Sequence, residues 1–171
     1  MKRLFLLIGI LFIAVIIPPL QSASLGSGPE EKPFVNIRPL AVLVEDLDED
    51  AKRAWLDKDE IQAQVELKLR QNGIPVRNLR DYTTESSYIY INVNLLYLKE
   101  IEHYIYNVEL SLYQTVFLLH NSFTKKVATW NKSRLGISPG PNTREKVEGI
   151  IDDLLTFFLN NYLAVNPPGK K

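Results

Sequence analysis

Residues 86–98, SSYIYINVNLLYL, alternate their side chains in the pattern that decides the fold. One set of alternating positions is apolar and contains Ile89, Ile91, Val93 and Leu95. The positions between them carry Tyr88, Tyr90, Asn92 and Asn94. Successive side chains of a β-strand point to opposite faces of the sheet. The segment is therefore predicted to be a strand with one buried face and one wetter face.

A longer alternating run follows at 104–119, YIYNVELSLYQTVFLL. Its apolar set consists of Tyr106, Val108, Leu110, Leu112, Val116 and Leu118. The opposite set consists of Asn107, Glu109, Ser111, Tyr113 and Thr115. Residues 99–103 between the two runs are few and polar, which predicts a hairpin. A third run at 126–133 is predicted to continue this antiparallel meander.

The segment before the hairpin predicts a strand, a helix and a short second strand. Residues 40–44, LAVLV, form a continuous apolar run, as in a strand covered on both faces or nearly so. Asp57 and Glu60 have the spacing of a capping box, and the apolar stripe of the following helix is Ile61, Val65 and Leu69. Gly73 is a favoured residue for ending that helix, and 74–76, IPV, is predicted to be a short edge strand.

The segment after the meander predicts a loop at 136–141 and a closing helix. Asn142 and Glu145 offer a second capping box. The apolar stripe of this helix comprises Val147, Ile150, Ile151, Leu154, Phe158 and Tyr162. The predicted fold class is therefore α+β, a mostly antiparallel sheet of about five strands with two helices packed on one face. The element order is β-α-β-β-β-β-α, in a single domain that spans 35–166.

The first residues, 1–24, have the features of a secretory signal peptide. Lys2 and Arg3 precede an apolar run at 4–17, which is shorter than the roughly 20 residues needed to span a membrane. Cleavage is expected after one of three small residues, Ser22, Ala23 or Ser24. An uncleaved segment that anchors the chain in the membrane is the alternative.

Two further terminal segments are expected to lie outside the domain. Residues 25–34 contain Gly, Pro and charged residues and are predicted to form a flexible leader, and 167–171 are predicted to form a disordered tail. The predicted location is the periplasm or the extracellular space, with the membrane contacted only transiently through the signal peptide.

The composition excludes several classes of function. The chain has 171 residues, with 20 Lys and Arg against 20 Asp and Glu, so its overall charge gives no electrostatic case for nucleic-acid binding. It contains no Cys, which removes disulfides, thiol catalysis, thiolate metal sites and a lipid anchor on an amino-terminal Cys. The fold must therefore be held by its hydrophobic core, which is feasible at this length.

The acidic segment 45–50, EDLDED, raises the question of a metal site. Asp46, Asp48 and Asp50 match the first three ligand positions of a calcium-binding EF-hand loop. The sixth position is Ala51, however, where the sharp turn of that loop requires Gly. The segment is therefore interpreted as a solvated turn, and neither a metal nor another cofactor is expected.

No catalytic residues are predicted. His103 and His120 fall near opposite ends of one predicted strand, roughly 50 Å apart if the strand is straight, so they are not expected to share a site. Glu100 and Glu102 lie in the predicted hairpin turn and are expected to face water, where burial does not raise a carboxyl pKa. The sequence contains no nucleophile elbow, zinc-protease motif or phosphate-binding loop.

Tyrosine is concentrated in the hairpin, and this is the feature that suggests a function. One explanation is structural, because Tyr favours strands and aromatic residues pair across neighbouring strands. The polar and aromatic face is also a candidate binding face, because Tyr is amphipathic and loses little entropy when it is immobilised. The candidate partner-binding residues are Tyr88, Tyr90, Asn92, Asn94, Asn107, Glu109 and Tyr113. Ser111 is predicted to lie on the same face.

The order of elements from Leu40 to Leu163 resembles small bacterial envelope domains. The amino-terminal domain of TolB translocation proteins and the LptE lipopolysaccharide-assembly proteins are similar in this plan. The resemblance implies an envelope setting and non-catalytic interaction, and no individual residue role is carried over.

The sequence therefore predicts an exported, non-enzymatic envelope or periplasmic domain that binds another envelope protein or a surface component. One alternative is a binder of a small apolar ligand or lipid between the helices and the sheet, with Phe117, Phe123, Phe157 and Phe158 as candidate wall residues. Another is a hydrolase that uses a pair of carboxylates.

Overall fold

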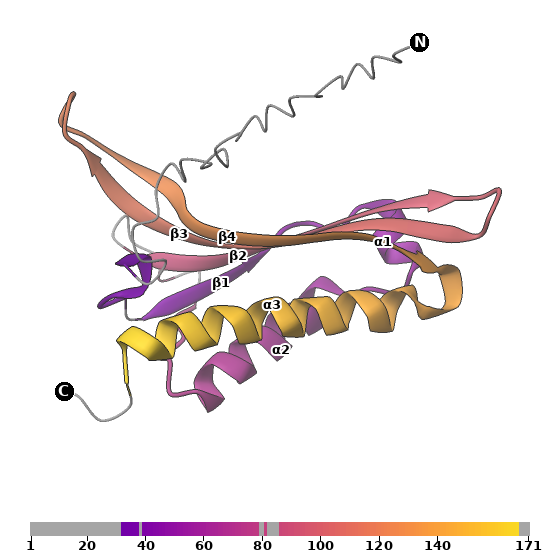
Figure 1. Cartoon of the computed structure of the whole chain (residues 1–171), viewed down its shortest axis with the longest axis horizontal. Helices are drawn as coiled ribbons and strands as arrows, with labels where there is room; N and C mark the ends of the chain where they lie inside the picture. The colour runs from indigo at the N-terminus through magenta and orange to yellow at the C-terminus, as the bar shows by residue number, and fades with distance from the viewer. Residues whose placement is uncertain (1–31, 38, 79–80, 82–85, 168–171) are drawn as a thin grey trace, which may run out of the picture.

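The computed structural model of the chain, shown in Figure 1, describes residues 32–37, 39–78, 81 and 86–167. The predicted signal peptide and most of the predicted leader and tail lie outside these residues. The elements in chain order are η1 (Lys32–Phe34), β1 (Leu40–Val44), α1 (Glu49–Arg53), α2 (Lys58–Gln71), β2 (Ser87–Leu98), β3 (His103–Leu118), β4 (Phe123–Pro139), η3 (Gly140–Asn142) and α3 (Thr143–Val165).

The strands form one mixed sheet in the order β1-β2-β3-β4, which confirms the predicted α+β class. β1 is parallel to β2, and β2, β3 and β4 form an antiparallel meander. The described residues contain four strands rather than the expected five. The segment predicted as the additional strand makes one parallel bridge, between Val76 and Leu40. Pro75 has no N–H with which to extend a ladder there.

The two long helices, α2 and α3, cover one face of the sheet, and no other helix of the described residues covers the opposite face (Figure 1). We call these the inner and the outer face. Alternate residues of β2 and β3 point inward as predicted, and those from Ile89 to Leu95 and from Tyr104 to Leu112 are buried. They pack against the apolar stripe of α2 and that of α3, in which Phe158 and Tyr162 are fully buried. The fold therefore positions an open sheet face over a well-filled core.

β4 is much longer than predicted. It pairs with β3 along nearly its whole length, from Leu118↔Phe123 to His103↔Pro139. The prediction that 136–141 is a loop is wrong for its first four residues, and only Gly140–Asn142 forms a turn before α3. The predicted capping box is also absent, because Asn142 makes no side-chain cap hydrogen bond. Instead, the Thr143 hydroxyl donates to the Pro139 carbonyl at 3.0 Å.

The β3–β4 hairpin continues past the region covered by the helices (Figure 1). A register shift between Leu112 and Tyr113 marks the start of this extension. The predicted burial of Leu118 is therefore wrong, since that side chain is 39% exposed and lies among further exposed apolar residues, Phe117, Leu119 and Phe123. Alternation predicted the face to which Leu118 points but could not show where the covering helices end.

The core begins earlier in the chain than expected. Phe34, assigned from sequence to the end of the flexible leader, is fully buried. Its ring makes edge-to-face contacts with Trp130 and Phe158, at centroid distances of 5.6 and 5.4 Å. Asn166, at the end of α3, donates to the Phe34 carbonyl at 2.7 Å. The last residues of the predicted leader are therefore part of the folded body.

Candidate interaction surface

The register of β2 and β3 places the predicted binding residues on the outer face. Four cross-strand pairs build this surface, Tyr88↔Tyr113, Tyr90↔Ser111, Asn92↔Glu109 and Asn94↔Asn107. β1 lies on one side of them, with Leu43 beside Tyr90. β4 lies on the other side, with Asn131 beside Ser111 and Ser133 beside Glu109. The structure thus brings together all seven candidate residues and Ser111.

The tyrosines form a compact cluster at one end of this surface. The Tyr88 and Tyr113 rings stack at 5.0 Å with an interplanar angle of 4°, and the Tyr90 ring meets the Tyr113 ring edge-on at 5.6 Å. The Lys126 ammonium lies 5.7 Å from the centroid of the Tyr88 ring. Burial, and then the hydrogen bond and charge of Glu45, raise the pKa of Tyr90 to about 12. The three tyrosine rings of the cluster are therefore held in place by contact with one another.

The centre of the surface is polar, and some of its polar side chains form hydrogen bonds with one another. Ser111 is fully buried although it points to the outer face, and its hydroxyl donates to the Glu109 carboxylate at 2.6 Å. Asn94 is exposed and Asn92 is partly exposed. Their amide groups offer both donors and acceptors to a partner.

An apolar row at the other end of the surface was missed by the sequence analysis. Leu96, Ile105 and Ile137 are neighbours in register across β2, β3 and β4, and Leu135 precedes Ile137 on the same face of β4. Leu96 is 56% exposed, Ile137 53% and Leu135 73%. The sequence did contain a signal for this row. Leu96 is apolar at an outward position of its strand, where the alternating pattern predicts a polar residue.

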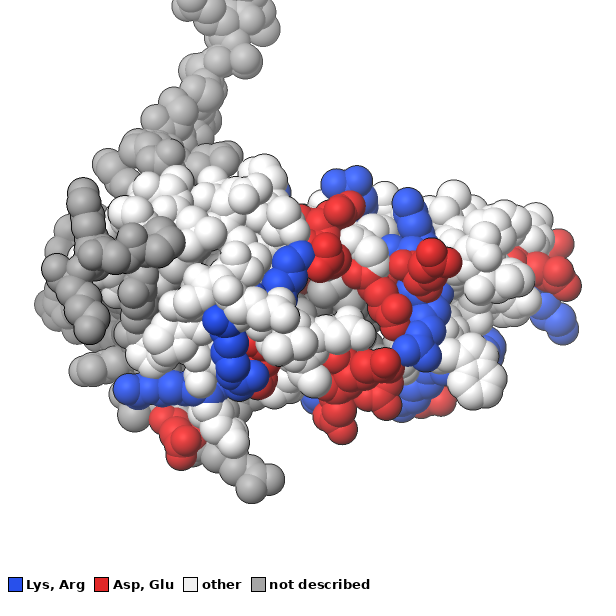
Figure 2. Space-filling view, turned by 90° about the horizontal axis from the view of Figure 1, so that it is seen from below, with Lys and Arg blue, Asp and Glu red and all other residues white. Residues whose placement is uncertain are grey.

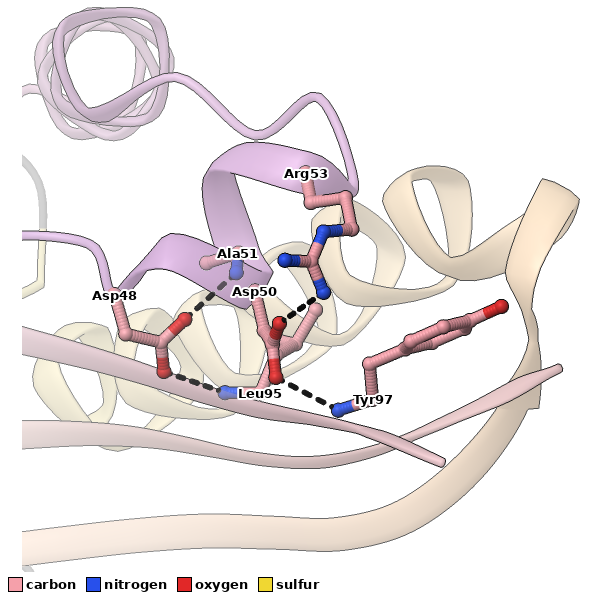
Figure 3. Close-up of polar contacts among 6 residues, drawn as sticks. All are labelled: Asp48, Asp50, Ala51, Arg53, Leu95 and Tyr97. Carbon is pink, nitrogen blue, oxygen red and sulfur yellow. Dashed lines mark hydrogen bonds and ion pairs between the residues drawn. The ribbon is translucent and has the colours of Figure 1, made fainter. Parts of the chain in front are cut away.

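The acidic segment, interpreted from sequence as a solvated turn, is instead attached to the edge of the sheet (Figure 3). β1 ends at Val44, after which Glu45 still donates to the Ile91 carbonyl at 2.9 Å. Asp48 then caps α1 through Ala51 N–H at 2.6 Å and accepts from Leu95 N–H at 3.0 Å. Its carboxylate therefore bonds α1 and β2 at the same time.

Asp50 repeats this arrangement two residues farther along the sheet edge. Its carboxylate accepts from Tyr97 N–H at 2.9 Å and pairs with the Arg53 guanidinium at 2.7 Å (Figure 3). Asp46, by contrast, is exposed and pairs with Lys58, which lowers the pKa of the Asp46 carboxyl. Only two of the three aspartates that match a calcium loop thus bond to the sheet, and in the described part of the chain no three metal-ligating side chains gather.

The other sequence candidates are scattered. His103 begins β3, where its Nδ1 lies 2.5 Å from the Ile101 carbonyl, and His120 is exposed in the turn after β3. Glu100 and Glu102 are exposed, as expected. The four phenylalanines proposed for an apolar ligand do not form one wall. Phe158 fills the core, Phe157 is 40% exposed on α3, and Phe117 and Phe123 lie at the hairpin tip.

The helical side of the molecule differs from the outer face in its charged side chains. Figure 2 shows Lys and Arg interspersed with Asp and Glu on this side. Several of these charges are paired, including Lys68 with Asp152 and Arg144 with both Glu60 and Glu148. No helix within the described ranges is long and apolar enough to cross a membrane.

The chain matches no protein-family model and no curated protein sequence. Thirteen chains of solved structures match it. A PelC dodecamer from Paraburkholderia phytofirmans has a TM-score of 0.40 and 14% identity, over 75% of this chain and 88% of that one. A minor lipoprotein from Acinetobacter baumannii has a TM-score of 0.39 and 10% identity, over 80% of this chain and 98% of that one.

Likenesses of this size identify neither a family nor a function. The functional argument therefore rests on the residues of this chain.

Proposed function

We propose that this protein is an exported, non-enzymatic domain of the cell envelope that binds another protein through the outer face of its sheet. The setting is inferred from the apolar leader at 1–24, which has the features of a signal peptide. The binding role is inferred from the outer face itself, and the row formed by Leu96, Ile105 and Ile137 is the observation that carries it.

The outer face has the composition of a protein interface. A sheet face that meets only water usually carries charged and small polar side chains. Across the outward positions of 88–98, 103–113 and 131–139, Glu109 is the only carboxylate, and neither Lys nor Arg occurs. Two further charged residues, Lys126 and Glu45, contact the tyrosine cluster from outside these ranges. Depletion of charge and enrichment of Tyr distinguish the centres of interfaces from the rest of a protein surface. Aligned, exposed aliphatic side chains add the apolar contact area that such a centre requires.

The surface also favours a protein over a small apolar ligand. Its apolar row and its tyrosine cluster lie at opposite ends of the strands, with Asn92 and Asn94 between them. A partner that contacts both ends must extend along the strands and must offer hydrogen bonds at the centre. A protein surface with an apolar patch and polar groups beside it satisfies both conditions.

Site-specific photo-crosslinking in the exporting cell tests this function. A photoreactive amino acid in place of Leu135, which is 73% exposed on the outer face, should capture a different protein that mass spectrometry can identify. The matched control is the same substitution at Leu67, which is 55% exposed on α2. We expect an adduct from position 135 and none from position 67.

A second variant connects the adduct to the apolar row. Ile137→Glu places a carboxylate beside Leu135 on the outer face and should abolish the adduct, whereas Leu67→Glu should not. An adduct that both positions form equally, an adduct only with another copy of this chain, or no adduct from position 135 would contradict the proposed function.

A further inference from the structure

A large aromatic residue occupies a backbone position that suits glycine. Trp55 follows the C-cap of α1 and has a φ of 63°, in the left-handed region that L-residues with bulky side chains avoid. Two hydrogen bonds fix this turn, from Trp55 N–H to the Lys52 carbonyl at 3.0 Å and from Leu56 N–H to the Ala51 carbonyl at 3.2 Å. This bonding pattern ends many helices, usually with Gly at the left-handed position.

The same chain contains that turn a second time, with glycine. After α2, Gly73 has a φ of 73°. Gly73 N–H donates to the Arg70 carbonyl at 3.0 Å, and Ile74 N–H donates to the Leu69 carbonyl at 3.1 Å. The two turns therefore have the same hydrogen-bond spacing, and they differ in the residue that adopts the positive φ.

Core packing does not account for the tryptophan. The side chain of Trp55 is 79% exposed, whereas Leu56 beside it is 5% exposed and belongs to the core. A non-glycine residue in this conformation costs roughly 1 kcal/mol. Strained backbone positions that stability does not explain are found preferentially at functional sites. The exposed indole is thus a candidate ligand contact.

Trp55 lines a cavity of about 640 Å³ at the end of the molecule where β2 and β3 turn. This volume falls in the roughly 300–1,000 Å³ range of small-molecule sites. The remaining lining residues come from α1, the two strands, η3 and α3, and they are Arg53, Ala54, Tyr97, Tyr104, Gly140, Pro141 and Arg144. The lining contains three aromatic rings and two guanidinium groups but no carboxylate.

The aromatic and cationic groups of the cavity are held in place. The Tyr97 and Tyr104 rings pack at 4.8 Å, and the Arg53 guanidinium lies 5.8 Å from the centroid of the Tyr97 ring. Asp50 orients Arg53 through one nitrogen, at 2.7 Å. Glu148 and Glu60 orient Arg144, each at 2.8 Å. A guanidinium has five N–H donors, so these ion pairs leave donors for a ligand.

We infer that this cavity binds an acidic oligosaccharide. The C–H face of a pyranose ring packs on an exposed indole, and Trp55 offers that flat surface at the mouth of the cavity. Arg53 and Arg144 supply planar donor sets that match a carboxylate on the sugar. The site lies next to the turn of the β2–β3 hairpin and involves none of the predicted partner-binding residues of the outer face.

Binding by the exported protein should be measured with three probes, tetragalacturonate, 3′-sialyllactose and a heparin tetrasaccharide. Trp55 and Trp130 are the only tryptophans, and Trp130 is 8% exposed, so a ligand at the cavity should change the emission of the exposed indole. Isothermal titration should give the affinity of each probe. At least one acidic probe should bind, and neutral cellotetraose should bind more weakly.

Variants at Trp55 separate the indole from the fold. Trp55→Gly should weaken binding of the acidic probe by about ten-fold or more while the protein remains folded, because glycine suits this turn. Trp55→Phe retains a ring and should lose less affinity, and Arg53→Gln should reduce the preference for acidic over neutral sugars. The inference is overturned if none of the three acidic probes binds at millimolar concentration, or if Trp55→Gly binds as tightly as the parent protein.

Discussion

The carboxylate of Asp48 accepts a hydrogen bond at 3.0 Å from the backbone N–H of Leu95, 47 residues away in the sequence. β1 has five residues and ends before it reaches this part of β2. Asp48 therefore provides the acceptor that a longer neighbouring strand would have provided, and Asp50 does the same for Tyr97. Two side chains satisfy sheet-edge groups that would otherwise need water or another strand.

Asp48→Ala should lower the free energy of unfolding by about 1–3 kcal/mol. It removes the N-cap of α1 and leaves the part-buried Leu95 N–H without its acceptor. Urea denaturation followed by circular dichroism would measure the change. Asp46→Ala is the matched control, because it removes an exposed carboxylate from the same segment and should shift the midpoint much less. Equal shifts for the two variants would contradict this role of Asp48.

Gly136→Ala should destabilise the protein by about 1–3 kcal/mol through overpacking. Gly136 lies opposite Tyr106 in register, and a Cβ at Gly136 would come within 2.3 Å of the Tyr106 hydroxyl oxygen and 2.6 Å of Cζ. Tyr106 is buried, so its ring has little room to move. Thermal unfolding would report the loss. The double variant with Tyr106→Leu should lose less than the two single variants together, and strict additivity would exclude the predicted clash.

Substitutions at the two left-handed turns should change the stability of the protein in opposite directions. Trp55→Gly should raise the free energy of unfolding by roughly 1 kcal/mol, because it relieves a strained φ at an exposed site. Gly73→Ala should lower it by a similar amount, since an added Cβ there meets no atom within 4 Å and only the backbone conformation opposes it. Chemical denaturation of both variants would test the pair. A Trp55→Gly variant less stable than the parent would show that the indole stabilises the fold.

The stability of the protein should fall between pH 10 and about 12, in part because of Tyr90. The pKa of Tyr90 is raised from 10.0 to about 12 in the folded state, first by burial and then by Glu45. Over this interval the unfolded chain loses the phenol proton before the folded chain does, so rising pH favours unfolding. Below pH 10 the contribution of Tyr90 is constant.

Tyr90→Phe provides the comparison for this pH dependence. Unfolding midpoints measured from pH 9 to pH 12 should decline less steeply in the variant than in the parent protein, because the variant has no phenol at this position. Ultraviolet titration of the folded parent should show one tyrosine that ionises near pH 12 and is missing from the variant. Identical pH profiles would contradict the assignment.

Alternation with a period of two predicted the β2–β3 hairpin and the division of its side chains between two faces, because each outward or inward position is set locally by the backbone. The extent of β4 was not predicted. Gly136, Pro139 and Gly140 are typical turn residues, and their local preference indicated a loop. Pairing with the long partner strand β3 overrides that preference in the structure, and such a tertiary effect is not visible in a local window.

Only part of the candidate surface was predicted, because alternation within a strand is visible in the sequence and the register between strands is not. Tyr88, Tyr90 and their neighbours follow the strand alternation, so sequence placed them together. The apolar row was missed, since Ile105 and Ile137 meet only through the register of β3 and β4. The role of Asp48 and Asp50 was missed as well. The dense negative charge of residues 45–50 led to the prediction of a solvent-exposed turn. Nothing in the sequence showed that β1 ends before the edge of β2 is fully paired.

The burial of Phe34 sets a limit on how far the amino terminus can be shortened without opening the core. Trimming that stops before Phe34 leaves its ring packed between Trp130 and Phe158. Removal of that ring would open a hole in the centre of the protein at a cost of about 3–5 kcal/mol, a large part of the stability of an ordinary domain. Any form of the chain that lacks this phenylalanine would therefore lose the centre of its aromatic core.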